Sequence, residues 1–370
     1  MKRSSIPILT SLRIFAALLV LIYHYDIDRP LSFLAHVSSF GYDAVTFFFV
    51  LSGFILTYAH LETGEPKKLN LSPTAFMAHR IARIAPAYLI GLALAAPFFI
   101  VGYAINHQLS TSRFVAGVLL VPTALQAWYP STATLWNIPA WSLSVELFLY
   151  VSFTPLVRIA SRIKQIELLI AAYVLVCAIA FARVYFGSIP PATDPWWRNF
   201  FAYFPLWHLP QFIFGVALGT LFISRKRFSQ RVHETILLSS MVGIGVILWY
   251  HSSIPMLSSN VILAPAFGIL IFGAAGANGP FSRILSARLL VLLGDASYAT
   301  YIIHFPLWQW WQRITAKDLR IEFYPLIDFF CYLLLVLVAS ILVYTFIERP
   351  ARRWLLLQAS RIRATQSTTE

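Results

Sequence analysis

The chain has 370 residues, of which 59% are hydrophobic and only 12% are charged, and its mean hydropathy is +0.72. A soluble domain carries about 25% charged residues, so this composition excludes a soluble protein and indicates a polytopic membrane protein. The net charge of +13 does not indicate nucleic-acid binding, because the Lys and Arg residues gather in short loops between apolar runs, as the positive-inside rule expects.

Ten apolar stretches are long enough to cross a membrane, and they predict an all-α bundle of about ten transmembrane helices. The stretches cover residues 11–28, 40–61, 83–103, 139–157, 166–186, 200–222, 234–250, 259–277, 288–311 and 326–347. An eleventh run, 112–128, is short and is broken by Pro122, so we expect it to re-enter the membrane or to lie on its surface.

The basic residues at both ends of the chain place both termini in the cytoplasm. The charges of the loops agree with this orientation only if 112–128 does not cross. The polar loops are too short for a core of their own. We therefore expect one membrane-embedded domain over residues 1–350 and a cytoplasmic tail over 351–370, disordered from about residue 356.

The first span carries an arginine and a histidine, Arg13 and His24, eleven positions apart. Eleven steps of a helix return to nearly the same face and rise about 16 Å. One stripe of this helix therefore holds a cation near the inner surface and an imidazole about three turns deeper. Both groups are costly in lipid, so each is a candidate for function.

Other ionisable groups also fall in or beside the spans. Asp43, Glu146 and His304 join His24 in the predicted outer half of the membrane. On the inner side Arg80 and Arg83 lie three residues apart on one helix face, an arrangement that suits phosphate.

Each of these groups also has a purely structural interpretation, and the sequence leaves these open. His24 can be a hydrogen-bonding group between helices, and Arg80 and Arg83 can be charges that fix orientation. Glu146 can pair with an arginine. Asp43 can cap the second span, which is its expected single role. Asp295 can pair with Arg288 or cap a helix.

Several motifs in this order resemble the acyltransferase-3 family of integral membrane acyltransferases. They are the Arg13–His24 spacing, FFFVLSGF at 47–54, the Arg80 and Arg83 pair, WSLSVE at 141–146 and SYATYIIHFPL at 297–307. The resemblance covers residues 11–350. Its most specific parts are the Arg–His spacing and WSLSVE.

The resemblance implies transfer of an acyl group, often acetyl from acetyl-CoA, to a sugar or another acceptor in a bacterial cytoplasmic membrane. It implies that His24 is the catalytic base and that Arg13, Arg80 and Arg83 take part in activity, and we expect these arginines to hold the phosphates of acyl-CoA. Asp43 or Glu146 would then orient the imidazole of His24, as in a catalytic triad. The expected acceptor is a cell-surface polysaccharide or a lipid-linked sugar.

A transporter is the main alternative, because ten spans with internal prolines and embedded charges also suit transport. Transporter folds often contain paired repeats with broken helices, and the sequence shows no such repeat. No cluster of His, Cys and carboxylate residues has the spacing of metal ligands, so we expect no metal.

Overall fold

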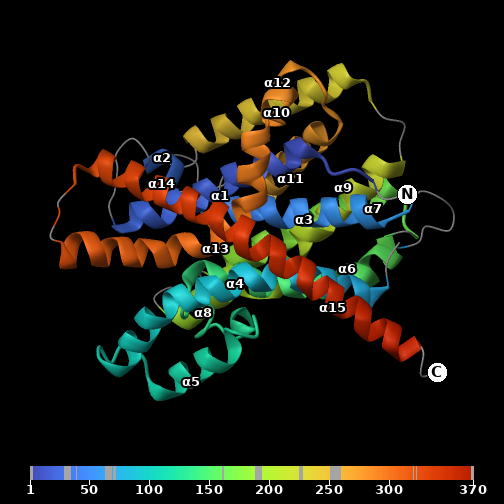
Figure 1. The fold of residues 1–370 in the computed structure, drawn as a ribbon. Coiled ribbons are helices and arrows are strands. Elements are labelled where there is room, and N and C mark those ends of the chain that lie inside the picture. The colour runs from blue at the N-terminus through green and yellow to red at the C-terminus, as the bar shows by residue number, and fades with distance from the viewer. Residues whose placement is uncertain are drawn as a thin grey trace.

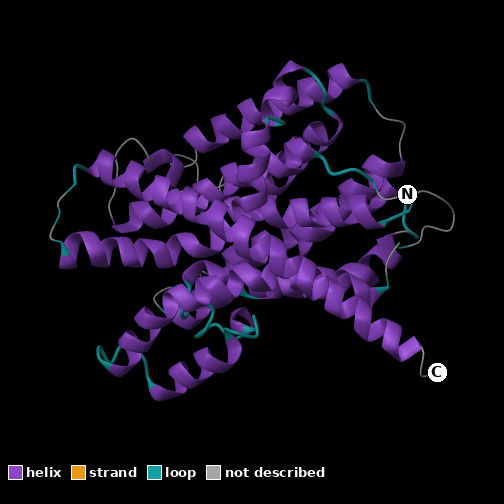
Figure 2. Cartoon of the chain, in the orientation of Figure 1, coloured by secondary structure: helices purple, strands orange, loops and turns teal. Residues whose placement is uncertain are grey.

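The computed structural model describes residues 3–28, 35–38, 40–62, 69, 72–160, 162–187, 194–224, 228–250, 260–319, 321 and 323–367. Within these ranges the regular structure is helical, apart from one isolated bridge between Leu61 and Leu69 (Figure 2). The predicted all-α fold is confirmed.

In the described part of the chain ten helices build the bundle, and each matches one predicted span (Figure 1). They are α1 (Pro7–Asp28), α3 (Ala44–His60), α4 (Pro73–Ala104), α6 (Trp141–Ala160), α7 (Gln165–Gly187), α9 (Leu209–Ser224), α10 (Gln230–Tyr250), α11 (Asn260–Gly276), α13 (Arg288–Gln312) and α14 (Pro325–Val343). The sixth span is continued at its start by α8 (Pro195–Tyr203) and the short 3₁₀ helix η3 (Pro205–His208).

Length and composition allow eight membrane crossings among the described residues, and α3 and α11 are shorter apolar helices of 17 residues each. Seventeen residues of helix rise about 25 Å, which is near the lower limit for a membrane span. The eight long helices and these two account for the ten predicted spans.

The helix directions agree with ten crossings. Thr10 of α1 lies against Gly294 of α13, and His24 lies against His304, so α1 and α13 run in the same direction. Helices α3 and α9 are also parallel, because Val50 contacts Gly215 and Thr57 contacts Gly219. Parallel packing of spans one and nine, and of spans two and six, requires that 112–128 does not cross.

The segment 112–128 forms a short helix followed by a buried turn. Helix α5 (Thr111–Leu120) ends just before Pro122, and it lies at the edge of the bundle (Figure 1). The chain then turns through the 3₁₀ helix η1 (Gln126–Trp128), and the amide of Gln126 donates to the carbonyl of Ala140 at 2.7 Å. The break at Pro122 is confirmed, and the second half of the segment packs on the start of α6.

The C-terminal segment differs from our expectation of disorder. A π-helical turn, η7 (Tyr344–Glu348), joins α14 to α15 (Arg349–Ser367), which packs on α4. Both chain ends lie at the right of Figure 1. The expectation of disorder from residue 356 is wrong as far as Ser367, and residues 368–370 lie outside the described residues.

The remaining helices are short or lie between the long ones. They are α2 (Ala35–Ser38), the 3₁₀ helix η2 (Ile138–Ala140), α12 (Pro280–Leu285) and the π helix η6 (Arg313–Asp318).

Candidate active site

A pocket of about 410 Å³ opens between α1, α3, α4, α6 and α13, with η7 and α15 on one side. This volume lies within the usual range of small-molecule sites. One end is lined by Arg3 and Ser4 beside the N-terminus, and the other end by Val45, Ser142 and Tyr301. Since α3 and α6 cross most of the bundle, the pocket extends along much of its height.

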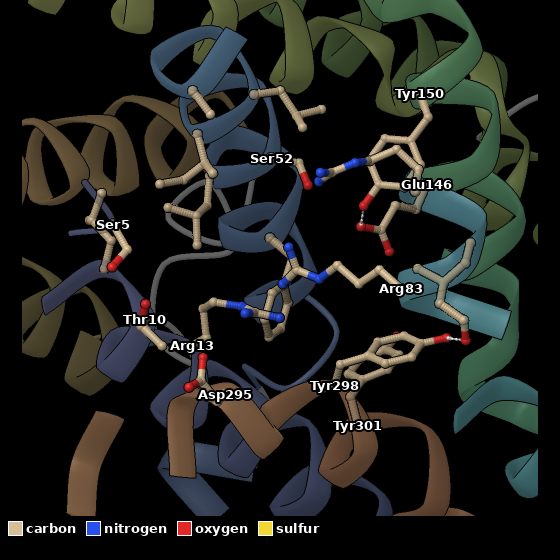
Figure 3. Close-up of a pocket in the computed structure, with 18 of the residues that line it drawn as sticks. Ser5, Thr10, Arg13, Ser52, Arg83, Glu146, Tyr150, Asp295, Tyr298 and Tyr301 are labelled. Atoms are coloured by element: carbon tan, nitrogen blue, oxygen red, sulfur yellow. Dashed lines mark hydrogen bonds between the residues drawn. The ribbon is translucent and has the colours of Figure 1, made fainter. Parts of the chain in front are cut away.

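Besides Arg3 at one end, four more arginines line this pocket, and they come from three different parts of the chain. Arg13 belongs to α1, Arg80 and Arg83 to α4, and Arg352 to α15. Figure 3 shows Arg13 and Arg83 extending from opposite sides of the pocket toward its centre. The predicted grouping of Arg13, Arg80 and Arg83 is therefore present, and Arg352 adds a fourth cation.

These guanidinium groups have few partners among the described residues. Arg13, Arg80 and Arg83 make no hydrogen bond there and no ion pair within 4 Å. Arg80 lies over the rings of Phe76 and Tyr150, at 5.5 and 5.9 Å from their centroids, and its buried Nε has no partner. A buried donor without an acceptor is costly, so the pocket is suited to an anion with several acceptor oxygens.

Three carboxylates share the pocket with the arginines: Glu146 of α6, Asp295 of α13 and Glu348 of η7. All three interact electrostatically with Arg13. Glu146 accepts a hydrogen bond from the hydroxyl of Tyr150 (Figure 3), whereas the buried Oε2 of Glu348 has no hydrogen-bond partner among the described residues. With four arginines and three carboxylates, these seven side chains carry a net positive charge when all are ionised.

The N-terminal segment is fixed at the mouth of the pocket. Arg3 donates to the backbone carbonyls of Tyr58 and Leu61 at the end of α3, with 2.9 Å to the carbonyl of Leu61. A cation at a helix C-terminus neutralises the free carbonyl groups there. Arg3 therefore holds the start of the chain against α3.

His24 does not line this pocket; it packs against His304 of α13. The Nδ1 atom of His24 lies 3.2 Å from Nε2 of His304, and the ring centroids are 5.0 Å apart. Tyr301 connects the two regions, because its ring lines the pocket and lies 6.2 Å from that of His304. The hydroxyl of Tyr301 is held by Ser142 at 2.7 Å.

The two carboxylates that we considered as partners of His24 lie in different surroundings. Glu146 shares the pocket of Arg13, and along α1 this arginine is about 16 Å from His24. Asp43 occupies the N-cap position of α3, but its side chain makes no capping hydrogen bond, so the capping interpretation is wrong. Asp43 instead interacts electrostatically with Arg183 and Tyr23.

The sequence analysis missed Glu348 and Arg352 as candidates. Both follow the last predicted span directly. The basic residues there indicate which side of the membrane the C-terminus is on, and this explanation does not require a place in a site. Glu348 and Arg352 lie four residues apart, directly after the last span. In a helix this spacing places both side chains on the same face, which is the signal in the sequence that could have identified them. Among the described residues, no group of three or more His, Cys, Asp or Glu side chains is arranged to hold a metal ion.

Comparison with known proteins identifies the family. The sequence profile of an acyltransferase domain, that of the acyltransferase-3 family, matches residues 6–345. The chain belongs to the acyltransferase-3 family. It is thus a membrane protein of a family of acyltransferases, as the motifs predicted.

Three relatives illustrate the range of similarity. Acyltransferase MdmB of Streptomyces mycarofaciens is 26% identical over 85% of this chain and 82% of its own length. The exopolysaccharide production protein ExoZ of Rhizobium meliloti is 24% identical over 73% of this chain and 77% of its own. The O-acetyltransferase OatA of Staphylococcus aureus is 23% identical over 94% of this chain and 57% of its own. No solved structure matches the chain.

Proposed function

We propose that this protein transfers an acyl group, acetyl in the simplest case, from cytoplasmic acyl-CoA to a hydroxyl of a cell-surface polysaccharide or lipid-linked sugar. Family membership supports acyl transfer. The names of OatA and ExoZ support an O-linked acetyl group and a polysaccharide acceptor. The protein acts in a bacterial cytoplasmic membrane with both termini in the cytoplasm.

The observation that carries the proposal is a pocket beside the N-terminus in which Arg80 is buried, Arg13, Arg83 and Arg352 are half-buried, and none of the four forms an ion pair within 4 Å among the described residues. CoA is cytoplasmic and bears several phosphate groups. Arg13, Arg80, Arg83 and Arg352 supply donors that carboxylates do not already occupy within 4 Å. A ligand that spreads its negative charge over many oxygens fits this set.

His24 acts as the general base in this proposal. The acceptor oxygen attacks the carbonyl carbon of the thioester while His24 removes the hydroxyl proton. The new carbon–oxygen bond forms, the carbon–sulfur bond breaks, and the proton passes from the imidazole to the leaving thiolate of CoA. The products are the acylated acceptor and free CoA.

The position of Glu146 favours a role with the donor rather than with the imidazole. Its carboxylate lies with Arg13 in the pocket and accepts from Tyr150. Glu146 therefore keeps the arginines apart and oriented while the phosphates are absent. Asp43 contributes to the acceptor side, because it lies at the opposite end of α3 from the pocket mouth.

The donor has to reach past aromatic rings to meet His24. Phe48 and Tyr301 line the pocket and contact each other edge-to-face, with centroids 5.8 Å apart. Beyond Tyr301 lie His304 and His24. The pantetheine arm of CoA is long and thin, and it delivers the thioester past Tyr301 while the phosphates stay with the arginines.

The test is acyl transfer by the purified protein in liposomes, with radiolabelled acetyl-CoA inside and a soluble oligosaccharide acceptor outside. We expect His24→Ala to lower kcat about 10²–10⁴-fold. His107→Asn, an exposed histidine in a left-handed conformation that Asn tolerates, is the control. Full activity of His24→Ala would reject the base, and substrate flux without any acylation would favour a transporter.

A further inference from the structure

His304 is a buried titratable group that the mechanism above does not use. It is 0% exposed on α13, and its Nε2 atom lies 3.2 Å from Nδ1 of His24. Phe305 also contacts the ring of His24 edge-to-face, with centroids 5.6 Å apart. The residues around His24 on this side are therefore fixed by α13.

The hydrogen bonds of His304 define which of its nitrogens carries the proton. Its Nδ1 atom lies 3.2 Å from the backbone carbonyl of Thr300. A carbonyl oxygen only accepts, so Nδ1 is the donor in this contact. A neutral imidazole has one N–H, and Nε2 of His304 is therefore an acceptor that faces His24.

The same reasoning applies to His24. Its Nδ1 atom lies 2.9 Å from the carbonyl of Val20 and 3.2 Å from Nε2 of His304. Both partners accept, so the proton of neutral His24 lies on Nδ1 and is shared between them. The opposite tautomer would direct the lone pair of Nδ1 at two other lone pairs. The basic lone pair of His24 is then on Nε2.

We propose that His304 is a positioning residue that holds His24 in the Nδ1–H tautomer, so that Nε2 removes the proton of the acceptor hydroxyl. This inference rests on the proposed function for the catalytic step, but the tautomer itself does not depend on it. When Nε2 takes the proton, the imidazolium of His24 donates more strongly through Nδ1 to the neutral His304. His304 thus fills the role that a carboxylate has in a Ser-His-Asp triad.

The surroundings of His304 keep its ring in place. The hydroxyl of Tyr332 on α14 donates to the backbone carbonyl of His304 at 2.9 Å. On α13, Ile302 and Ile303 are completely buried, and the hydroxyl of Tyr301 accepts a hydrogen bond from Ser142. The pair of histidines is therefore set by the packing of α13 against α1 and α14.

The first experiment compares two substitutions of His304. His304→Gln brings an amide oxygen close to the position of Nε2, and this oxygen accepts from Nδ1–H of His24. His304→Leu has no acceptor. We expect His304→Leu to lower kcat by about 10²-fold or more while the KM for acyl-CoA stays the same, and His304→Gln to restore most of kcat.

The second experiment reads the tautomer directly, by ¹⁵N NMR of histidine-labelled protein in nanodiscs, with His24→Gln to assign the signals. We expect Nδ1–H for His24 in the wild type and in His304→Gln. In His304→Leu the carbonyl of Val20 still accepts from Nδ1, so we expect a larger share of Nε2–H than in the wild type rather than a complete change of tautomer. Nε2–H in the wild type, or wild-type kcat in His304→Leu, would overturn the inference. If His304→Leu does not fold, the wild-type spectrum alone decides. If the wild type transfers no acyl group, the proposed function fails, and the spectrum still tests the tautomer.

Discussion

The side-chain amide of Asn137 donates to the backbone carbonyl of Ile302 at 2.9 Å, and Asn137 is completely buried. Four residues after Ile302 the chain has Pro306, which has no N–H to complete the helical hydrogen bond. Asn137 thus satisfies the carbonyl that the proline leaves free. This bond fixes the segment of α13 that carries Tyr301 and His304.

Replacing Asn137 by Ala should destabilise the protein by about 1–2 kcal/mol, because a buried carbonyl loses its donor inside the membrane. Thermal unfolding in detergent measures this loss. Because α13 positions the histidine pair, kcat should fall, and it should change by a larger factor than the KM for acyl-CoA.

Pro306→Ala provides the matching test, since it returns an N–H to the carbonyl of Ile302. In the Pro306→Ala background, Asn137→Ala should cost less than it does in the wild type, and the two effects should not add. Strict additivity would show that the two residues act independently and would contradict this account of the bond.

The arginines of the pocket should separate donor binding from chemistry. Arg80→Ala and Arg83→Ala each remove a charge-assisted hydrogen bond to phosphate, which is worth about 1.5–3 kcal/mol. The KM for acyl-CoA should therefore rise roughly 10- to 100-fold, with little change in thermal stability. Arg288→Ala, an exposed arginine at the start of α13, is the control. Unchanged acyl-CoA binding in both variants would remove the phosphate role.

The C-terminal helix should also contribute to donor binding. Arg352 lines the pocket and interacts electrostatically with Arg83 and Glu348. Arg352→Ala should raise the KM for acyl-CoA, whereas Arg353→Ala, the exposed neighbour on the same turn, should leave it unchanged. Equal effects of the two substitutions on KM would indicate a general effect of surface charge.

The sequence predicted the spans well because each span is a continuous run of apolar residues with charges at its ends, and such a run can be recognised without knowing any contact between helices. It also predicted that 112–128 does not cross, since the loop charges constrain the number of crossings. It grouped Arg13, Arg80 and Arg83 from their predicted place on the inner side of the membrane and from the family motifs. These features depend on composition and order rather than on contacts between distant helices.

The sequence did not predict which distant segments contact one another. Glu348 and Arg352 reach the pocket because η7 and α15 both pack on α4. The pairing of His24 with His304 depends on α1 and α13 packing in parallel, and 280 residues separate the two histidines. Asp43 has the residue type of a cap, but its backbone is helical, so its side chain does not reach the free N–H groups.

Helices α3 and α9 are in backbone contact at glycines, and this contact gives a test of the fold apart from the chemistry. A Cβ atom at Gly215 would lie 2.0 Å from the carbonyl oxygen of Val50, and one at Gly53 would lie 2.2 Å from that of Phe212. Small residues permit such backbone contact in membranes. Gly215→Leu should therefore separate the helices and destabilise the protein by about 1–3 kcal/mol.

Gly243 in α10 is the matched control, because a Cβ atom there meets nothing within 4 Å. Gly243→Leu should leave the Tm unchanged or raise it, since Leu favours helix more than Gly does. Thermal unfolding of the two variants in the same detergent decides the matter. A Tm for Gly215→Leu equal to that of Gly243→Leu would show that α3 and α9 are not in backbone contact. The parallel packing that supports ten crossings would then lose one of its two helix pairs.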